Sequence, residues 1–125
     1  MTIAQTCLLV AVLLPFATAW TAKAGAFALK DNHDPRGWSS RQSGWRARAV
    51  AAQANGFEAL PLLIAGLFVA WQREAAQSTV DALALAFVGL RLAYIGLYIA
   101  DQATLRSLVW TASVGCVLAM FFVGR

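Results

Sequence analysis

The chain has 125 residues, of which 60% are hydrophobic and only 13% are charged. A soluble domain usually contains about 45–50% apolar and about 25% charged residues, so this composition argues against a soluble protein. Four spans of about 20 residues would use most of the chain, which leaves too little for a separate soluble domain. The formal net charge of +4 comes from basic residues that mostly flank apolar runs, so it indicates membrane topology rather than nucleic-acid binding.

The first apolar run, residues 3–20, predicts a membrane-spanning helix. An Ala-Thr-Ala triplet at 17–19 resembles a signal-peptidase site, but no Lys or Arg precedes the run as a signal peptide requires. We therefore expect a retained helix. Turn- and loop-forming residues fill positions 21–45, which predicts a loop with a short interfacial piece around Trp38 and Trp45.

Three further apolar runs predict helices over residues 46–71, 81–100 and 105–123. The connections between these runs are short, and short connections join antiparallel neighbours. We therefore predict an all-α fold, an integral membrane four-helix up-down-up-down bundle that forms a single transmembrane domain over residues 1–125.

The orientation in the membrane follows from the Lys and Arg residues near the ends of the spans. Seven lie in the 21–45 loop, at the start of the second span or after the third span, and two lie at the other ends. Basic residues concentrate on the cytoplasmic side of membrane proteins. We therefore expect the 21–45 loop in the cytoplasm and both termini on the non-cytoplasmic side.

Polar residues interrupt the second span on one face. Asn55 and Glu58 are three positions apart, and Arg48 lies seven positions before Asn55, so the three share a helical face. A charged side chain at the centre of a bilayer costs about 2.5–3.5 kcal/mol. We therefore expect this face to meet the bundle interior, a cavity or a neighbouring subunit.

The third span carries Arg91, Tyr94 and Tyr98 on one face, at positions i, i+3 and i+7. We expect Arg91 to pair with Glu58 across the helices, because pairing would neutralise two costly charges. Two interpretations of this pair stay open here: a structural ion pair without chemistry, or part of a functional site.

The fourth span opens with Arg106 and Ser107, and Trp110 lies one turn deeper. Arg106 is either an anchor at the membrane surface or the partner of an anion or a thiolate. No group of His, Cys or carboxylate residues has the spacing of a metal site, so no metal is expected. His33, the only histidine, is expected to be a solvated loop residue.

Motifs in the second span and the loop resemble one known family. Asn55-x-x-Glu58 followed by Pro61 is similar to the second-helix signature of the MAPEG family, the membrane-associated proteins in eicosanoid and glutathione metabolism. The loop sequence Asp-Asn-His-Asp-Pro-Arg at 31–36 resembles the small bacterial branch of that family.

A second match follows in the right order along the chain. The pattern Arg91-x-x-Tyr94-x-x-x-Tyr98, followed by Arg106-Ser107, resembles the third helix, short link and fourth-helix start of the same family. Each motif is weak when taken singly, but together they extend over nearly the whole chain.

The resemblance implies an assembly and an activity. MAPEG members are four-helix subunits that form homotrimers, and the active ones bind glutathione between neighbouring subunits near the cytoplasmic side. With glutathione as substrate or cofactor, these members act as transferases, peroxidases or isomerases on lipophilic substrates. For this chain the resemblance implies a homotrimer in the lipid bilayer of a bacterial inner membrane, with glutathione as cofactor and a lipophilic small molecule as substrate.

The resemblance also implies roles for single residues. Asn55 and Glu58 would hold polar groups of glutathione, Tyr98 would contact the tripeptide, and Arg106 would lie near the thiol with Ser107 beside it. A nearby arginine lowers the pKa of a thiol and so favours the nucleophilic thiolate. The expected cofactor-binding residues are Arg48, Asn55, Glu58, Arg91, Tyr94 and Tyr98, and the expected catalytic residues are Arg106 and Ser107.

Two other functions stay open. Glutathione-binding members have further arginines where this chain has Ala51 and Ala54, which favours a non-catalytic membrane scaffold or binding protein of the same fold. A small transporter is the third hypothesis, since four-helix exporters also use a membrane-embedded glutamate, here Glu58. The many arginines argue against the export of cations.

Overall fold

The computed structural model describes residues 1–125, and all of its regular structure is helical. Four helices are long and apolar enough to cross a membrane. They are α1 (Ile3–Lys23), α3 (Gly44–Gln72), α4 (Gln77–Ile99) and α5 (Ala103–Met120). The predicted fold class, an all-α four-helix membrane bundle, is therefore confirmed.

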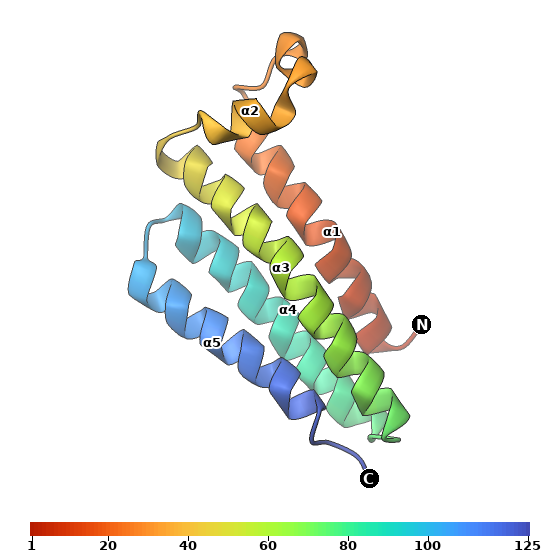
Figure 1. Cartoon of the computed structure of the whole chain (residues 1–125). Coiled ribbons are helices and arrows are strands. Elements are labelled where there is room, and N and C mark those ends of the chain that lie inside the picture. The colour runs from red at the N-terminus through yellow and green to blue at the C-terminus, as the bar shows by residue number, and fades with distance from the viewer.

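Consecutive long helices run antiparallel to one another, and both termini lie at the end of the bundle opposite the α1–α3 connection (Figure 1). α1 packs mainly on α3, and α4 packs mainly on α5. α3 and α5 contact each other less than any other pair of neighbouring long helices. We call the end that holds the α1–α3 connection the basic end, because most of the Lys and Arg residues lie there.

The connection between α1 and α3 contains two short helices. η1 (Leu29–His33) is a 3-10 helix, and α2 (Pro35–Ser40) is a single short α-helix. Pro35 lies in the first turn of α2, where its missing N–H costs nothing. The carboxylate of Asp34 accepts the N–H of Gly37 over 2.9 Å and so caps the helix. The predicted loop over 21–45 is therefore more ordered than its composition indicates.

Trp38 holds α2 against the rest of the protein. Its side chain is only 5% exposed and meets the ring of Phe27 edge-on, with the ring centroids 5.2 Å apart. The side chain of Gln42 donates to the carbonyl of Trp38 over 2.8 Å. Of the two tryptophans expected in an interfacial piece, Trp38 is thus buried, whereas Trp45 in the first turn of α3 is exposed.

Some helix ends differ from the predicted spans, and at the start of α4 the reason is that polar residues continue the helix. α4 begins at Gln77 rather than Asp81, and the side chain of Gln77 donates to the Asp81 carboxylate over 2.8 Å within the first turns. The same carboxylate accepts the N–H of Ala4 over 2.7 Å and so caps the start of α1. α5 ends at Met120 rather than at residue 123.

The other end of α1 is closed by an arginine from α3. Nη1 of Arg46 donates to the carbonyls of Ala22 and Ala24, over 2.7 Å in both cases. These carbonyls have no partner within the helix, and a cation at a helix C-terminus also suits the helix dipole. α1 therefore continues past residue 20 to Lys23.

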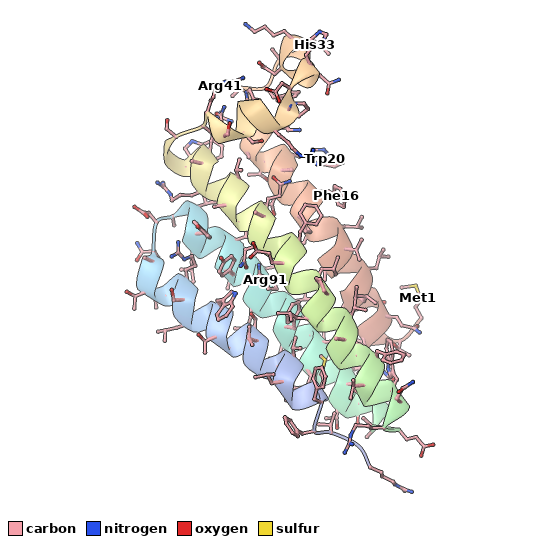
Figure 2. All side chains as sticks on the ribbon, viewed as in Figure 1. Met1, Phe16, Trp20, His33, Arg41 and Arg91 are labelled. Carbon is pink, nitrogen blue, oxygen red and sulfur yellow. The ribbon has the colours of Figure 1, made fainter.

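Small residues bring α1 and α3 close together. A Cβ atom built on Gly56 of α3 would lie 3.0 Å from Cγ of Pro15 in α1. Large apolar side chains such as Phe16 and Trp20 instead project away from the bundle (Figure 2), as expected for a surface in lipid. Arg91 lies within the bundle, where the site described next begins.

Candidate functional site

A groove opens at the basic end between α4 and α5, with one side chain from α3. Its volume is about 430 Å³, which is within the range of about 300–1,000 Å³ for small-molecule sites. We call it the polar groove. The residues that line it are Asn55, Tyr94, Tyr98, Arg106, Ser107, Trp110 and Thr111. The structure thus brings together five of the eight candidate residues predicted from the sequence.

The polar groove forms where two helical faces meet. Tyr94 and Tyr98 are four residues apart on α4, so their rings lie one above the other. On α5, Ser107 precedes Trp110 by three positions and Thr111 by four, which again places the three side chains on one face. The spacing in the sequence therefore accounts for most of the lining.

Two arginines and two tyrosines form a continuous stack beside the groove. The guanidinium of Arg91 lies 4.2 Å from the ring centroid of Tyr94, and that of Arg106 lies 4.2 Å from the ring centroid of Tyr98. The two rings meet edge-on, with centroids 5.6 Å apart. A cation over a ring face is attracted by the ring's negative charge. The stack therefore holds Arg106 in place while its in-plane N–H groups stay available to a ligand.

Asn55 connects Arg91 with Glu58. Nη2 of Arg91 donates to Oδ1 of Asn55 over 2.8 Å, and Nδ2 of Asn55 donates to Oε2 of Glu58 over 3.2 Å. The predicted direct pair of Arg91 with Glu58 is therefore wrong. An amide can accept from a cation and donate to a carboxylate at once, so Asn55 links the two charges without their contact.

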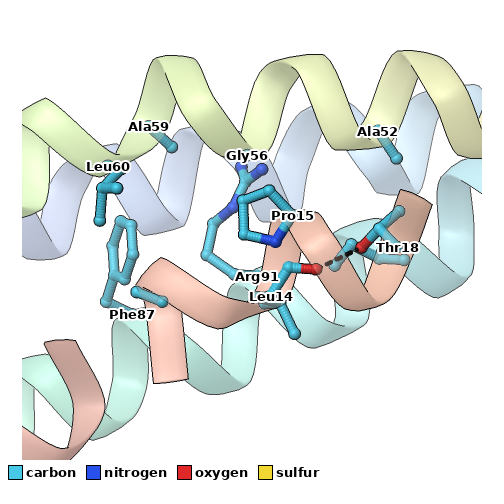
Figure 3. A pocket seen from close by; sticks show the side chains of 11 residues that line it. Leu14, Pro15, Thr18, Ala52, Gly56, Ala59, Leu60, Phe87 and Arg91 are labelled. Atoms are coloured by element: carbon cyan, nitrogen blue, oxygen red, sulfur yellow. Dashed lines mark hydrogen bonds between the residues drawn. The ribbon is translucent and has the colours of Figure 1, made fainter. Parts of the chain in front are cut away.

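Arg91 supports the polar groove from behind and does not line it. Its side chain is 3% exposed, and no protein atom accepts a hydrogen bond from its buried Nη1. It borders a gap of about 10 Å³ between α1, α3 and α4, beside Pro15, Gly56 and Thr18 (Figure 3). A gap of this size suits one water molecule. Arg91 is thus a positioning residue that orients Asn55 and Tyr94.

Arg48 does not line the polar groove either. Its Nε donates to the carbonyl of Ile99 in the last turn of α4, over 3.0 Å. This bond satisfies a carbonyl at the end of that helix. Arg48 shares a helical face with Asn55, but it lies two turns nearer the basic end, where α4 ends.

Glu58 lies in a smaller cleft next to the polar groove. This cleft has a volume of about 60 Å³, lies between α3 and α5, and shares Asn55 and Trp110 with the groove. Glu58 is exposed in the single subunit although it belongs to a membrane-spanning helix. Its one hydrogen bond comes from the side chain of Asn55, so most of the acceptor capacity of the carboxylate is free.

Two lining residues were not among the predicted site residues. Trp110 and Thr111 follow Ser107 at i+3 and i+4, and this spacing is the signal that finds them. The hydroxyl of Thr111 donates to the carbonyl of Ser107 over 2.9 Å, so it can accept a hydrogen bond from a ligand but has no proton left to donate to one. No group of three or more His, Cys, Asp or Glu side chains is placed to hold a metal ion.

The four apolar helices define an integral membrane protein, and the polar groove lies at one end of its bundle. The family model of the MAPEG family matches residues 3–124 of the chain. The protein therefore belongs to the MAPEG family, and the resemblance seen in its sequence is confirmed. A search of curated proteins finds no match, and neither does a search of solved structures.

Proposed function

We propose that this MAPEG protein binds glutathione in the polar groove. With bound glutathione it acts as a transferase or a peroxidase on lipophilic electrophiles. One observation carries the proposal. Asn55, Tyr98, Arg106 and Ser107 match glutathione-contacting positions of the family by resemblance, and all four line a single groove although they come from three helices.

The donors and acceptors of the groove suit the functional groups of glutathione. Glutathione has two carboxylates, and the planar fork of Arg106 can bind one of them or the thiolate. The hydroxyl of Ser107 and the phenol groups of Tyr94 and Tyr98 offer further hydrogen bonds. The amino group of glutathione is a cation, and Glu58 in the adjoining cleft is the nearest carboxylate for it.

Arg106 supplies the chemistry that this site needs. A positive charge beside a thiol stabilises the thiolate, and the thiolate is the nucleophile. As a transferase, its sulfur forms a bond with an electrophilic carbon of the substrate, and the displaced electron pair leaves with the leaving group or takes up a proton. As a peroxidase, its sulfur attacks a hydroperoxide oxygen, the O–O bond breaks and the alcohol leaves with a proton. A second glutathione then displaces water from the oxidised sulfur and forms the disulfide. A lipophilic substrate would reach the groove from the bilayer, along the sparsely packed junction of α3 and α5.

We further propose that the protein is a homotrimer in a bacterial inner membrane, with both termini on the non-cytoplasmic side. The exposed carboxylate of Glu58 supports an assembly, because a neighbouring copy would remove it from lipid. The excess of Lys and Arg at the basic end supports the orientation.

A non-catalytic scaffold is the second candidate, and a specific observation favours it. Arg106 is the only arginine that lines the polar groove, since Ala51 and Ala54 replace basic residues of the family and Arg48 binds Ile99. A single arginine binds an anionic ligand less tightly than several would. The two candidates differ in whether glutathione binds.

Calorimetric titration of the purified protein in detergent with glutathione tests the proposal. We expect binding by the wild type, and about 10- to 100-fold weaker binding by Arg106→Ala, because a hydrogen-bonded charge pair contributes about 1.5–3 kcal/mol. Arg125→Ala removes the same charge at the opposite end of the chain and serves as the matched control. No binding by the wild type at millimolar glutathione, with the assembly intact, would leave the scaffold as the function.

A further inference from the structure

A second groove borders α3 at the basic end and shares no residue with the polar groove. It lies between α2 and α3 and has a volume of about 480 Å³. We call it the α2–α3 groove. The residues that line it are Arg36, Ser39, Ser40, Val50, Gln53, Ala54 and Phe57.

The α2 side of this groove is polar and firmly placed. Arg36, Ser39 and Ser40 occupy positions i, i+3 and i+4, so they share one face of the short helix. Trp38 is buried against Phe27, which fixes the helix in place. The hydroxyl of Ser40 donates to a carbonyl of its own helix, over 2.9 Å, so Ser39 is the hydroxyl that is free to donate.

The α3 side of the groove is mostly apolar. Val50, Gln53, Ala54 and Phe57 lie at i, i+3, i+4 and i+7 and share one face of α3. Gln53 is the only polar side chain among them. The groove therefore has a cation and hydroxyls on its α2 side. On its α3 side it has one amide among apolar side chains, and the aromatic ring lies farthest from the basic end.

The position of the groove along α3 places it at the edge of the hydrocarbon. The hydrocarbon core of a bilayer is about 30 Å thick, which corresponds to about 20 helical residues. Counting this length back from Trp71, near the opposite end of α3, puts the boundary close to Ala52. Arg36 is then at the level of lipid headgroups, and Phe57 is at the level of acyl chains.

The charges around the groove favour an anion. None of its seven lining residues is acidic. The two carboxylates nearest in the chain accept backbone N–H groups, Asp31 that of Ala28 over 2.8 Å and Asp34 that of Gly37 over 2.9 Å, and neither forms a salt bridge with Arg36. Arg36 is the only charged side chain that lines the groove, and it is a cation.

We propose that the α2–α3 groove binds one anionic glycerophospholipid. Its phosphate accepts hydrogen bonds from the guanidinium of Arg36 and the hydroxyl of Ser39, and its glycerol esters lie near Gln53. One acyl chain follows Ala54 and Phe57 into the hydrocarbon. A phospholipid fits better than a soluble anion because the groove changes from charged to apolar along the same direction as the lipid does.

Native mass spectrometry of the full chain tests this proposal. The protein is exchanged into detergent micelles doped with equal amounts of phosphatidylglycerol and phosphatidylcholine, and the lipids that stay bound to each subunit are counted. We expect the wild type to retain phosphatidylglycerol in preference to phosphatidylcholine. We expect Arg36→Gln to retain about 10-fold less phosphatidylglycerol, whereas Arg41→Gln, which removes a charge next to α2 but outside the groove, behaves as the wild type.

A second variant keeps the test independent of Arg36. Ala54→Trp fills the apolar half of the groove without a change of charge, and it too should lose phosphatidylglycerol. Equal losses in Arg36→Gln and Arg41→Gln would indicate diffuse attraction and overturn the proposal. Smaller assemblies in Arg36→Gln, with no lipid retained by the wild type, would show that a second copy of the chain covers the groove and would overturn it as well.

Discussion

Nη2 of Arg91 donates to Oδ1 of Asn55 over 2.8 Å, and this bond determines which end of the Asn55 amide faces each neighbour. The oxygen is held by the buried guanidinium, so the NH₂ group is left to donate to Glu58. A residue that does not line the groove thus orients one that does.

Asn55→Ala should destabilise the bundle. The substitution leaves the guanidinium of Arg91, which is 3% exposed, without its hydrogen-bond acceptor. We expect the free energy of unfolding to fall by about 1.5–3 kcal/mol, since the bond involves a charged group. The melting temperature in detergent measures the effect. Gln53→Ala, two positions earlier on α3 and without a protein hydrogen bond, is the control, and equal melting temperatures for the two variants would contradict the role of Asn55.

The ring of Tyr98 should matter for glutathione binding because it supports Arg106. The guanidinium lies 4.2 Å from the ring centroid, and such a contact contributes about 0.5–2 kcal/mol. We expect Tyr98→Leu to weaken glutathione binding by roughly 2- to 30-fold in a calorimetric titration. Tyr98→Phe keeps the ring and should bind nearly as the wild type does. If both variants lose affinity alike, the phenol group and not the ring is what the ligand requires.

Gly56→Val should push α1 away from α3. A Cβ at this position would already lie 3.0 Å from Cγ of Pro15, and the branched side chain adds two further methyl groups. Overpacking of this kind costs about 1–3 kcal/mol, so we expect a lower melting temperature in detergent. Gly96→Ala is the matched control, because no atom lies within 4 Å of its added Cβ. It should leave the melting temperature unchanged or raise it.

Arg46→Gln should open the last turn of α1 locally. The guanidinium donates to the carbonyls of Ala22 and Ala24 and lies 4.4 Å from the ring centroid of Trp45. Its loss leaves these carbonyls without a protein donor. We expect faster amide hydrogen exchange between Thr21 and Ala24, measured by mass spectrometry, with little change in global stability. Arg41→Gln removes a charge from the same end of the bundle and should leave this exchange as it is.

The sequence predicts the four spans well because hydropathy and length act on each helix alone. It places the start of α4 too late, since Gln77 and its polar neighbours read as a linker although they continue the helix. It places a short interfacial piece around Trp38 but does not predict the helix α2, because a helix as short as Pro35–Ser40 depends on the packing of Trp38 more than on local preference.

The lining of the polar groove was mostly predictable, since i, i+3 and i+4 spacings decide which side chains share a face. The partners across helices were not. Arg91 and Glu58 are the opposite charges within the spans that sequence reasoning pairs directly. The register between α3 and α4 instead places Asn55 between them. The sequence wrongly assigns Arg48 to the lining of the site for the same reason. Its hydrogen-bond partner is the carbonyl of Ile99, and the point where α4 ends determines this partner.

α1 is capped at both ends by residues that come later in the chain. Arg46, which closes its last turn, belongs to the second span, and Asp81, which caps its first turn, belongs to the third. During synthesis the first helix has its own capping box, formed by Thr2 and Gln5, but the N–H of Ala4 and the carbonyls of Ala22 and Ala24 do not yet have these partners. The C-terminal end of α1 gains its bonds to Arg46 when the second span is inserted. The N-terminal end gains its bond to Asp81 only when the third span is inserted. The order in which the helices are synthesised is thus also the order in which these partners of α1 become available.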